Sequence, residues 1–164
     1  SVDAVLDAAV RDEQAQADEK GVVVQVVREG EGPRGWVDPV LLERAIANLI
    51  RNAVSVSRRG EQVTVRRVLS GSGVDITVSD GGPGVPEVIR KTVFDAFVTH
   101  PLPQSGKALG VGLGLALARE IVRAHGGELT LDETVSRGAT FQLHLPLTRA
   151  PRAVAPTLEA SHVL

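Results

Sequence analysis

The stretch from Asp38 to Val54 constrains the fold most, because it has the marks of a long amphipathic helix. Asp38 is a favoured N-cap residue, and Pro39 is tolerated at the first helical position, where its missing N–H loses no hydrogen bond. Apolar residues recur on one face with the helical period: Leu42, Ala45, Ile46, Leu49, Ile50, Ala53 and Val54. Because the opposite face is polar, this helix must cover another layer of structure.

Candidate strands on both sides of this helix can form that layer. The β-branched run 22–27 precedes it, and alternating runs at 63–69 and 74–78, joined by glycine and serine, predict a β-hairpin. Two closing strands are expected at 128–131 and 140–147. The inward residues of the last strand are Phe141, Leu143 and Leu145.

Further helices are predicted over 2–20, ending at Gly21, and over a short segment near 86–91. Another begins near Gly114, and its expected apolar stripe is Leu113, Ala116, Leu117, Ile121 and Ala124. These helices and strands predict an α+β fold in which a helical layer covers a sheet.

The composition excludes several classes of function. The chain of 164 residues is one domain in length, and its net charge of −2 gives no basis for sequence-independent nucleic-acid binding. The absence of cysteine excludes disulfides, thiol catalysis and cysteine-bound metals. No apolar run approaches the roughly 18 residues of a membrane span, so direct membrane contact is not expected.

The histidines and arginine pairs carry little functional information. His100, His125, His144 and His162 lack the spacing of metal ligands. The pairs at 58–59 and 66–67 are interpreted as solvated charge.

Asn48 and Asn52 are four residues apart, so their carboxamides share one helix face. Amide oxygens suit a hard cation such as Mg²⁺, which keeps several of its waters. Taken alone, the pair is better explained as part of a solvated helix face.

The sequence Asp80-Gly81-Gly82-Pro83-Gly84 follows a predicted strand. Glycines after a carboxylate allow the backbone to approach a flat ligand, and the carboxylate can accept a hydrogen bond from an exocyclic amino group. Taken alone, the segment is better explained as a turn.

Gly110, Gly112 and Gly114 lead into the helix that begins near residue 114. They fit neither the P-loop nor the dinucleotide fingerprint, but glycine amides at a helix N-terminus can bind an anion. The alternative is close packing of that helix on the sheet. The long loop 98–109 before them is expected to be a mobile lid.

The order of these motifs is more specific than any one of them. Paired asparagines, Asp-x-Gly-x-Gly, Phe94-x-x-Phe97 and Gly-x-Gly-x-Gly resemble the ATP-binding catalytic domain of sensor histidine kinases over about 22–147. The resemblance implies the Bergerat fold, a two-layer α/β sandwich whose mixed, mostly antiparallel sheet is backed by about three helices.

The resemblance also implies roles for individual residues. Asn48 would bind Mg²⁺, Asn52 would contact the metal or the phosphates, and Asp80 would bind the adenine amino group. The remaining ATP-binding residues would be Gly82, Gly84, Lys107, Gly110, Gly112, Gly114, Leu115 and Thr140.

Asn48 also indicates the kind of reaction. Related gyrase, MutL and anti-sigma-factor kinases carry a glutamate general base there, and an amide cannot take a proton. Transfer to a neutral imidazole needs less deprotonation, so phosphorylation of histidine fits better than ATP hydrolysis or serine phosphorylation. Ser55 and Val56 replace a basic and an aromatic residue common in the family, which predicts a reduced nucleotide affinity.

Three segments are therefore expected. Residues 1–20 would form a helix that is a remnant of the connection to a dimerisation domain. Residues 21–147 would form the ATP-binding domain, and residues 148–164 a flexible tail. Expected partners are a nucleotide, the histidine-containing dimerisation domain of the same kinase and a response regulator receiver domain. The domain would be cytoplasmic, whether or not the full-length kinase has a membrane anchor. The alternative is a catalytically degenerate nucleotide-binding or docking module of the same fold.

Overall fold

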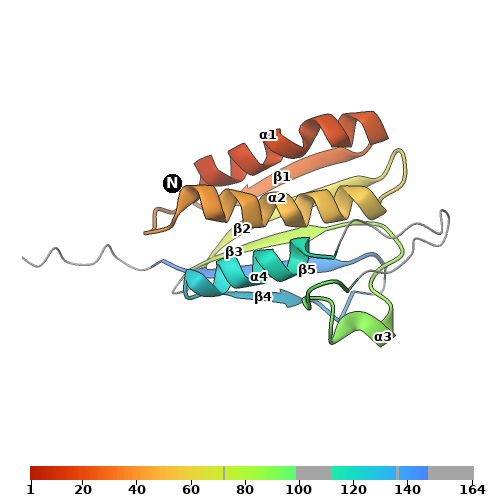
Figure 1. Ribbon diagram of the computed structural model, residues 1–164. Coiled ribbons are helices and arrows are strands. Elements are labelled where there is room, and N and C mark those ends of the chain that lie inside the picture. Colours follow the sequence, from red (N-terminus) through yellow and green to blue (C-terminus); the bar gives the residue numbers. More distant parts are fainter. Residues whose placement is uncertain (72, 99–111, 136, 148–164) are drawn as a thin grey trace, which may run out of the picture.

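The computed structural model describes residues 1–71, 73–98, 112–135 and 137–147. They form a two-layer sandwich in which one face of a five-stranded sheet is covered by helices (Figure 1). The elements are α1 (Val2–Lys20), β1 (Val23–Glu29), α2 (Pro39–Val56), β2 (Gln62–Ser70), β3 (Gly73–Ser79), α3 (Glu87–Arg90), α4 (Gly114–Ala124), β4 (Glu128–Leu131) and β5 (Thr140–Pro146). None of the helices in this described part is both long and apolar enough to cross a membrane.

The strand order is β1-β2-β3-β5-β4. Among the strands of the described residues, β1 and β2 alone pair in parallel, because α2 carries the chain back between them, and the other neighbours are antiparallel. The predicted two-layer sandwich with a mixed, mostly antiparallel sheet is thus confirmed. The β2–β3 hairpin closes at one end of the sheet, and β3 ends at the opposite end, beside the start of β5.

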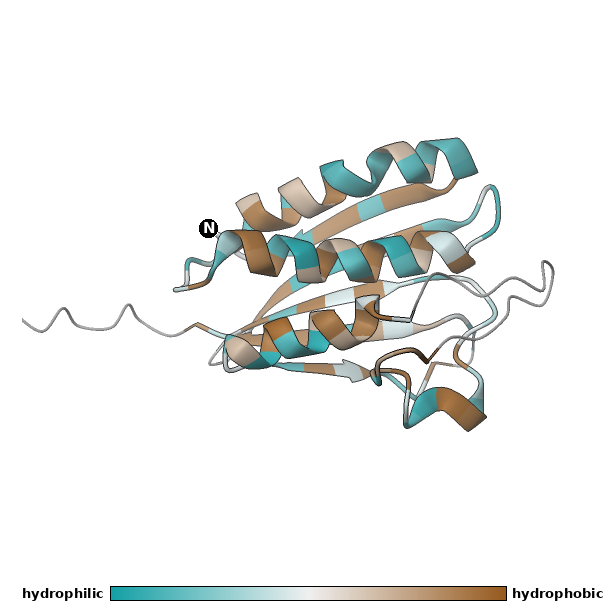
Figure 2. Cartoon of the chain, viewed as in Figure 1, coloured by the Kyte–Doolittle hydropathy of each residue, from teal (hydrophilic) through white to brown (hydrophobic). Residues whose placement is uncertain are grey.

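The helix α2 forms as the sequence predicts. The Asp38 carboxylate accepts hydrogen bonds from the N–H groups of Val40 and Leu41, both at 3.0 Å. All seven residues of the expected apolar stripe are buried in the core, and Figure 2 shows polar and apolar residues alternating around this helix. Burying one such side chain contributes roughly 1.5–3 kcal/mol, so α2 anchors the helical layer.

The expected stripe of α4 is partly wrong. Ala118, Ile121 and Val122 are buried, whereas Leu113 is 43% exposed and Ala124 is exposed. The helix begins at Gly114, so Leu113 lies before its first turn and does not share the inward face. The helix α4 packs against both α2 and the sheet. Its buried face is therefore centred on residues 118 and 122.

The helix α1 belongs to the same core. Val2, Val5, Leu6 and Ala9 are buried with the residues of α2 and the sheet. The buried carboxylate of Glu13 accepts two hydrogen bonds from the Arg51 guanidinium of α2, at 2.5 and 3.1 Å. The helix α1 therefore packs into the same hydrophobic core as α2 and the sheet.

The interpretation of Arg67 as solvated charge is wrong. Its side chain is 1% exposed and forms an ion pair with Asp3 of α1, with Nε 3.0 Å from Oδ1. The guanidinium also donates to the carbonyl oxygens of Glu29 and Glu31, at 2.6 and 3.1 Å. Arg67 alternates with Val63 and Val65 on the inward face of β2, so the strand period directs it under the loop after β1.

Candidate functional site

Most of the predicted site residues meet at the end of the sheet where β3 ends and β5 begins. Ser79 pairs with Thr140 in the sheet register, and Asp80 directly follows β3. The C-terminal half of α2 lies over this end, and the chain returns to it at the start of α4 (Figure 1). Segments far apart in the sequence are thus brought together here.

Asp80 is the buried acid of this site, with 7% of its surface exposed. Its Oδ1 atom accepts hydrogen bonds from the N–H groups of Gly82 at 2.9 Å and Ala139 at 3.3 Å. Its Oδ2 atom is buried and has no hydrogen-bond partner within the described residues. Burial raises the pKa of this carboxyl, although the two N–H donors act in the opposite direction. A buried acceptor without a donor is costly unless a ligand supplies one.

The glycines around Asp80 are required by close backbone contacts. Gly138 has a φ of +74°, and a Cβ on it would overlap the carbonyl oxygen of Asp80. A Cβ on Gly84, whose φ is +78°, would lie 2.8 Å from the carbonyl oxygen of Gly138. The segments that follow β3 and precede β5 therefore interlock, which holds the Asp80 carboxylate in one position.

Asn48 and Asn52 lie on the half-buried face of α2, and Asn48 faces the start of α4. A Cβ on Gly114 would be 3.8 Å from the Asn48 amide oxygen. Within the described residues, neither asparagine side chain forms a hydrogen bond, and no side chain caps the N-terminus of α4. Unpaired amides and open helical N–H groups together can bind anionic oxygens and a hydrated cation.

The two rings of the Phe94-x-x-Phe97 motif have different surroundings. Phe94 packs against the core, and Phe97 lies in solvent. Phe94 contacts Phe141 edge to face, at 5.9 Å between ring centres, and Arg119 of α4 lies 5.0 Å over the Phe94 ring. Phe97 is 71% exposed and has a φ of +67°. Its N–H donates to the carbonyl of Gly112 at 2.9 Å, which ties the end of the motif to the start of α4.

Two predicted residues lie differently from the expectation, and two cannot be placed. The Thr140 hydroxyl donates to the Ser79 hydroxyl at 2.9 Å on the sheet face opposite the helices, so Ala139 takes the place beside Asp80. Leu115 packs against the core. Lys107 and Gly110, like most of the expected lid, lie outside the described residues.

The two departures from the family pattern have local explanations. The Ser55 hydroxyl donates to the Asn52 carbonyl at 2.7 Å, within the same helix. Val56 lies against Gly82, where a Cβ would be 3.1 Å from both its Cγ2 atom and its carbonyl oxygen. Val56 thus forms part of the floor beneath the Asp80 segment.

Sequence reasoning did not identify Glu61 and Arg137 as neighbours of this site. The Glu61 carboxylate accepts from the Arg58 N–H at 2.7 Å and lies 3.6 Å from the Arg137 guanidinium. Its negative charge helps to raise the pKa of Asp80, after the larger effect of burial. No local pattern marks this pair, because its members are far apart in sequence.

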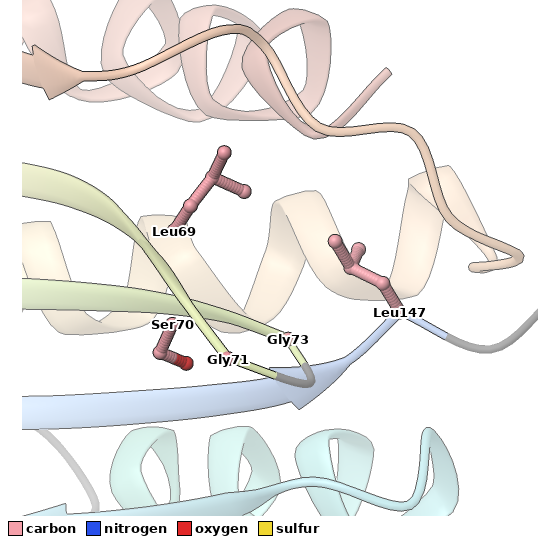
Figure 3. A pocket seen from close by; sticks show the side chains of 5 residues that line it. All are labelled: Leu69, Ser70, Gly71, Gly73 and Leu147. Carbon is pink, nitrogen blue, oxygen red and sulfur yellow. The ribbon is translucent and has the colours of Figure 1, made fainter.

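A cavity lies at the opposite end of the sheet. Its lining consists of Leu69, Ser70, Gly71, Gly73 and Leu147, with the two leucines pointing to the same side (Figure 3). None of these side chains titrates, so the cavity offers no group for acid–base chemistry. The described residues also contain no cluster of three or more histidine or acidic side chains that could hold a metal ion.

The family model described as histidine kinase-, DNA gyrase B- and HSP90-like ATPase matches residues 37–149. The chain is 36% identical over 132 residues to the C4-dicarboxylate transport sensor protein DctS of Rhodobacter capsulatus, which covers 78% of this chain and 19% of that protein. It is 31% identical over 148 residues to the sensor-like histidine kinase SenX3 of Mycolicibacterium smegmatis, covering 88% of this chain and 38% of that protein. The chain thus spans a minor part of these relatives.

Solved structures agree with this match. The catalytic domain of the histidine kinase ThkA superposes with a TM-score of 0.77 at 20% identity, covering 90% of this chain and 95% of that one, which supports the fold alone. The mycobacterial sensor histidine kinase MprB is 27% identical, with a TM-score of 0.71 and coverage of 86% and 93%. The chain is therefore a member of the histidine kinase-, DNA gyrase B- and HSP90-like ATPase family, and within it a catalytic domain of the sensor histidine kinase type.

Proposed function

We propose that this domain binds Mg·ATP, with Asp80 recognising the adenine amino group. The observation that carries the proposal is the buried Oδ2 atom of Asp80, which has no donor within the described residues. An exocyclic amino group would supply that donor, and the absence of side chains on Gly82 and Gly84 would admit the flat base. The likeness to the full-length kinase ShkA, solved with AMPPNP and 26% identical, supports the same assignment.

The phosphates would lie between α2 and the start of α4. Asn48 and Asn52 would offer amide oxygens, and the open N–H groups after Gly112 and Gly114 would face the negative charge. Mg²⁺ fits this donor set, because it takes oxygen ligands and keeps waters and phosphate oxygens in its coordination shell. The resemblance adds Lys107 and Gly110 to the phosphate contacts.

The reaction we propose is phosphoryl transfer to a histidine of a helical dimerisation domain, for relay to a response regulator. The lone pair of a neutral imidazole nitrogen forms the bond to the γ-phosphorus, the bond to the β–γ bridging oxygen breaks, ADP leaves, and the proton on the other ring nitrogen passes to solvent. Asn48 would orient the nucleotide and its cation without taking a proton, which suits a nucleophile that needs less deprotonation than water or a hydroxyl group. On this proposal, the domain functions in the cytoplasm.

The histidine-bearing helices would dock on apolar side chains near the start of α4. Val88 of α3 is 84% exposed, Phe97 71% and Leu113 43%. Figure 2 colours part of α3 as hydrophobic. Exposed apolar groups beside a nucleotide site are suited to a protein surface that brings the acceptor to the γ-phosphate.

The test is to supply a histidine-containing dimerisation domain and radiolabelled Mg·ATP and to measure acid-labile phosphohistidine. Asp80→Asn should abolish nucleotide binding and transfer. The matched control Asp75→Asn, on the sheet face opposite the helices, should retain both. Saturable ATP binding without transfer to any supplied domain would instead favour a docking module, for which Ser55 and Val56 are the motivating observation. No binding by the unaltered chain would overturn the proposal.

A further inference from the structure

The C-terminal turn of α2 is capped by a residue of α1. The Lys20 ammonium donates to the carbonyl oxygen of Val54 at 2.9 Å and also to that of Ser55. These are among the last carbonyls of α2, which have no N–H partner in their own helix. The last turn of α2 contains no basic residue of its own, so Lys20 supplies the positive charge that stabilises this helix end.

The same turn forms the floor of the Asp80 segment. Val56 directly follows the two carbonyls that Lys20 binds, and it lies against Gly82. The Gly82 N–H in turn donates to Oδ1 of Asp80 at 2.9 Å. A short sequence of contacts therefore runs from Lys20 through the end of α2 to the carboxylate.

Lys20 and Asp80 also share an electrostatic neighbour. Burial lowers the pKa of Lys20, and the nearby charge of Glu61 opposes that change. The same Glu61 charge adds to the effect of burial on Asp80. The cation of α1 thus belongs to the charged surroundings of the base site.

We propose that Lys20 is a positioning residue for the base of the nucleotide, acting through the last turn of α2. The inference rests on the proposed function, and it extends the site beyond the residues 37–149 that the family model matches. With Lys20 in place, the floor of the site is ordered before the nucleotide arrives. Without it, part of the binding free energy orders this turn.

The experiment compares Lys20→Met, Lys20→Arg and the control Arg11→Met, which removes an exposed cation from the same helix. Dissociation constants are measured for Mg·ATP and for adenosine, which lacks phosphates. Lys20→Met should weaken both by the same factor, about two- to fivefold, as expected from losing a charge at a helix C-terminus. Lys20→Arg should restore both, and Arg11→Met should change neither.

Two results would overturn the inference. Weaker ATP binding with unchanged adenosine binding would mean that Lys20 acts on the phosphates. Unchanged binding of both, with only a lower melting temperature, would mean that Lys20 is a helix cap alone. If Lys20→Met does not fold, Lys20→Gln, which keeps an N–H donor without the charge, makes the same comparison. Absence of binding by the unaltered chain would contradict the proposed function instead.

Discussion

The backbone N–H of Asp38 donates a hydrogen bond to Nε2 of His125 at 3.0 Å. The other ring nitrogen of His125, Nδ1, lies 2.7 Å from the carbonyl oxygen of Ile121. The ring therefore accepts from the N-cap residue of α2 and donates to the last turn of α4. One imidazole thus holds the end of one helix against the start of the other.

Replacing His125 with phenylalanine should lower the free energy of unfolding by about 1–2 kcal/mol, because two hydrogen bonds are lost while an aromatic ring is kept. His125→Asn, which keeps one donor and one acceptor, should lose less. Urea denaturation monitored by circular dichroism measures both. Equal stability of the phenylalanine variant and the unaltered chain would show that solvent replaces these bonds.

Arg66 and Arg67 are adjacent, but their substitutions should have very different effects. Arg67→Met removes the donor of several carbonyls and the nearer cation of Asp3, which is 23% exposed and keeps Arg28 at 4.0 Å, so we expect a loss of about 3 kcal/mol, at the low end for a broken buried ion pair. Arg66, 52% exposed and paired with Glu29 on the other sheet face, should change stability by less than about 0.5 kcal/mol when replaced by methionine. Thermal unfolding of the two variants side by side provides the check, and equal losses would contradict the buried position of Arg67.

Asp80→Asn should remove nucleotide binding without destabilising the unliganded fold. Burial raises the pKa of Asp80 above its ordinary value of 3.8, so the folded chain binds this proton more readily than the unfolded chain. The protonated carboxyl therefore makes a contribution to stability that is fully present below pH 3.8 and is lost as the pH rises from 3.8 through the raised pKa.

At neutral pH, the melting temperature of Asp80→Asn should thus equal or exceed that of the unaltered chain, and any difference should vanish in acid. In the unaltered chain, ATP affinity should fall as the pH drops through the raised pKa of Asp80, because the protonated oxygen no longer accepts from the amino group. Thermal melts across this pH range test the prediction about melting temperature, and calorimetric titrations with ATP test the prediction about affinity. A variant that melts well below the unaltered chain at neutral pH would show that the ionised carboxylate supports the fold.

Phe97→Gly should leave a more stable protein than Phe97→Ala, although glycine removes more of the side chain. The φ of +67° is unfavourable for any residue with a Cβ, and 71% exposure means that the ring contributes little to the core. Relief of this strain is worth about 1 kcal/mol. Both variants should reduce phosphotransfer while retaining ATP binding, because they remove a docking side chain. If alanine is as stable as glycine, the left-handed conformation carries no strain.

The parts of the fold that sequence predicts are those with local causes. The cap at Asp38 and the stripe of α2 depend on residues within a few positions of one another, and both are confirmed. The glycines after Asp80 are recognisable only in combination with the other motifs, because the segment taken alone also fits a turn.

The failures arise where distant segments meet. Arg67 is buried because Asp3 and the loop after β1 lie beside it, and nothing near it in the sequence signals that. Thr140 differs from Ala139 by one position, yet strand alternation sends the two side chains to opposite faces. Lys20 reaches the end of α2 only because the two helices pack side by side.

The hairpin between β2 and β3 lies at the end of the sheet away from Asp80, and a Cβ at Gly71 would meet no other atom within 4 Å. The chain contains no cysteine. A thiol introduced by Gly71→Cys would therefore be a unique attachment point for a fluorophore, a spin label or a surface tether. The domain could be immobilised or tracked through that position while its nucleotide end stays open to ligand and partner.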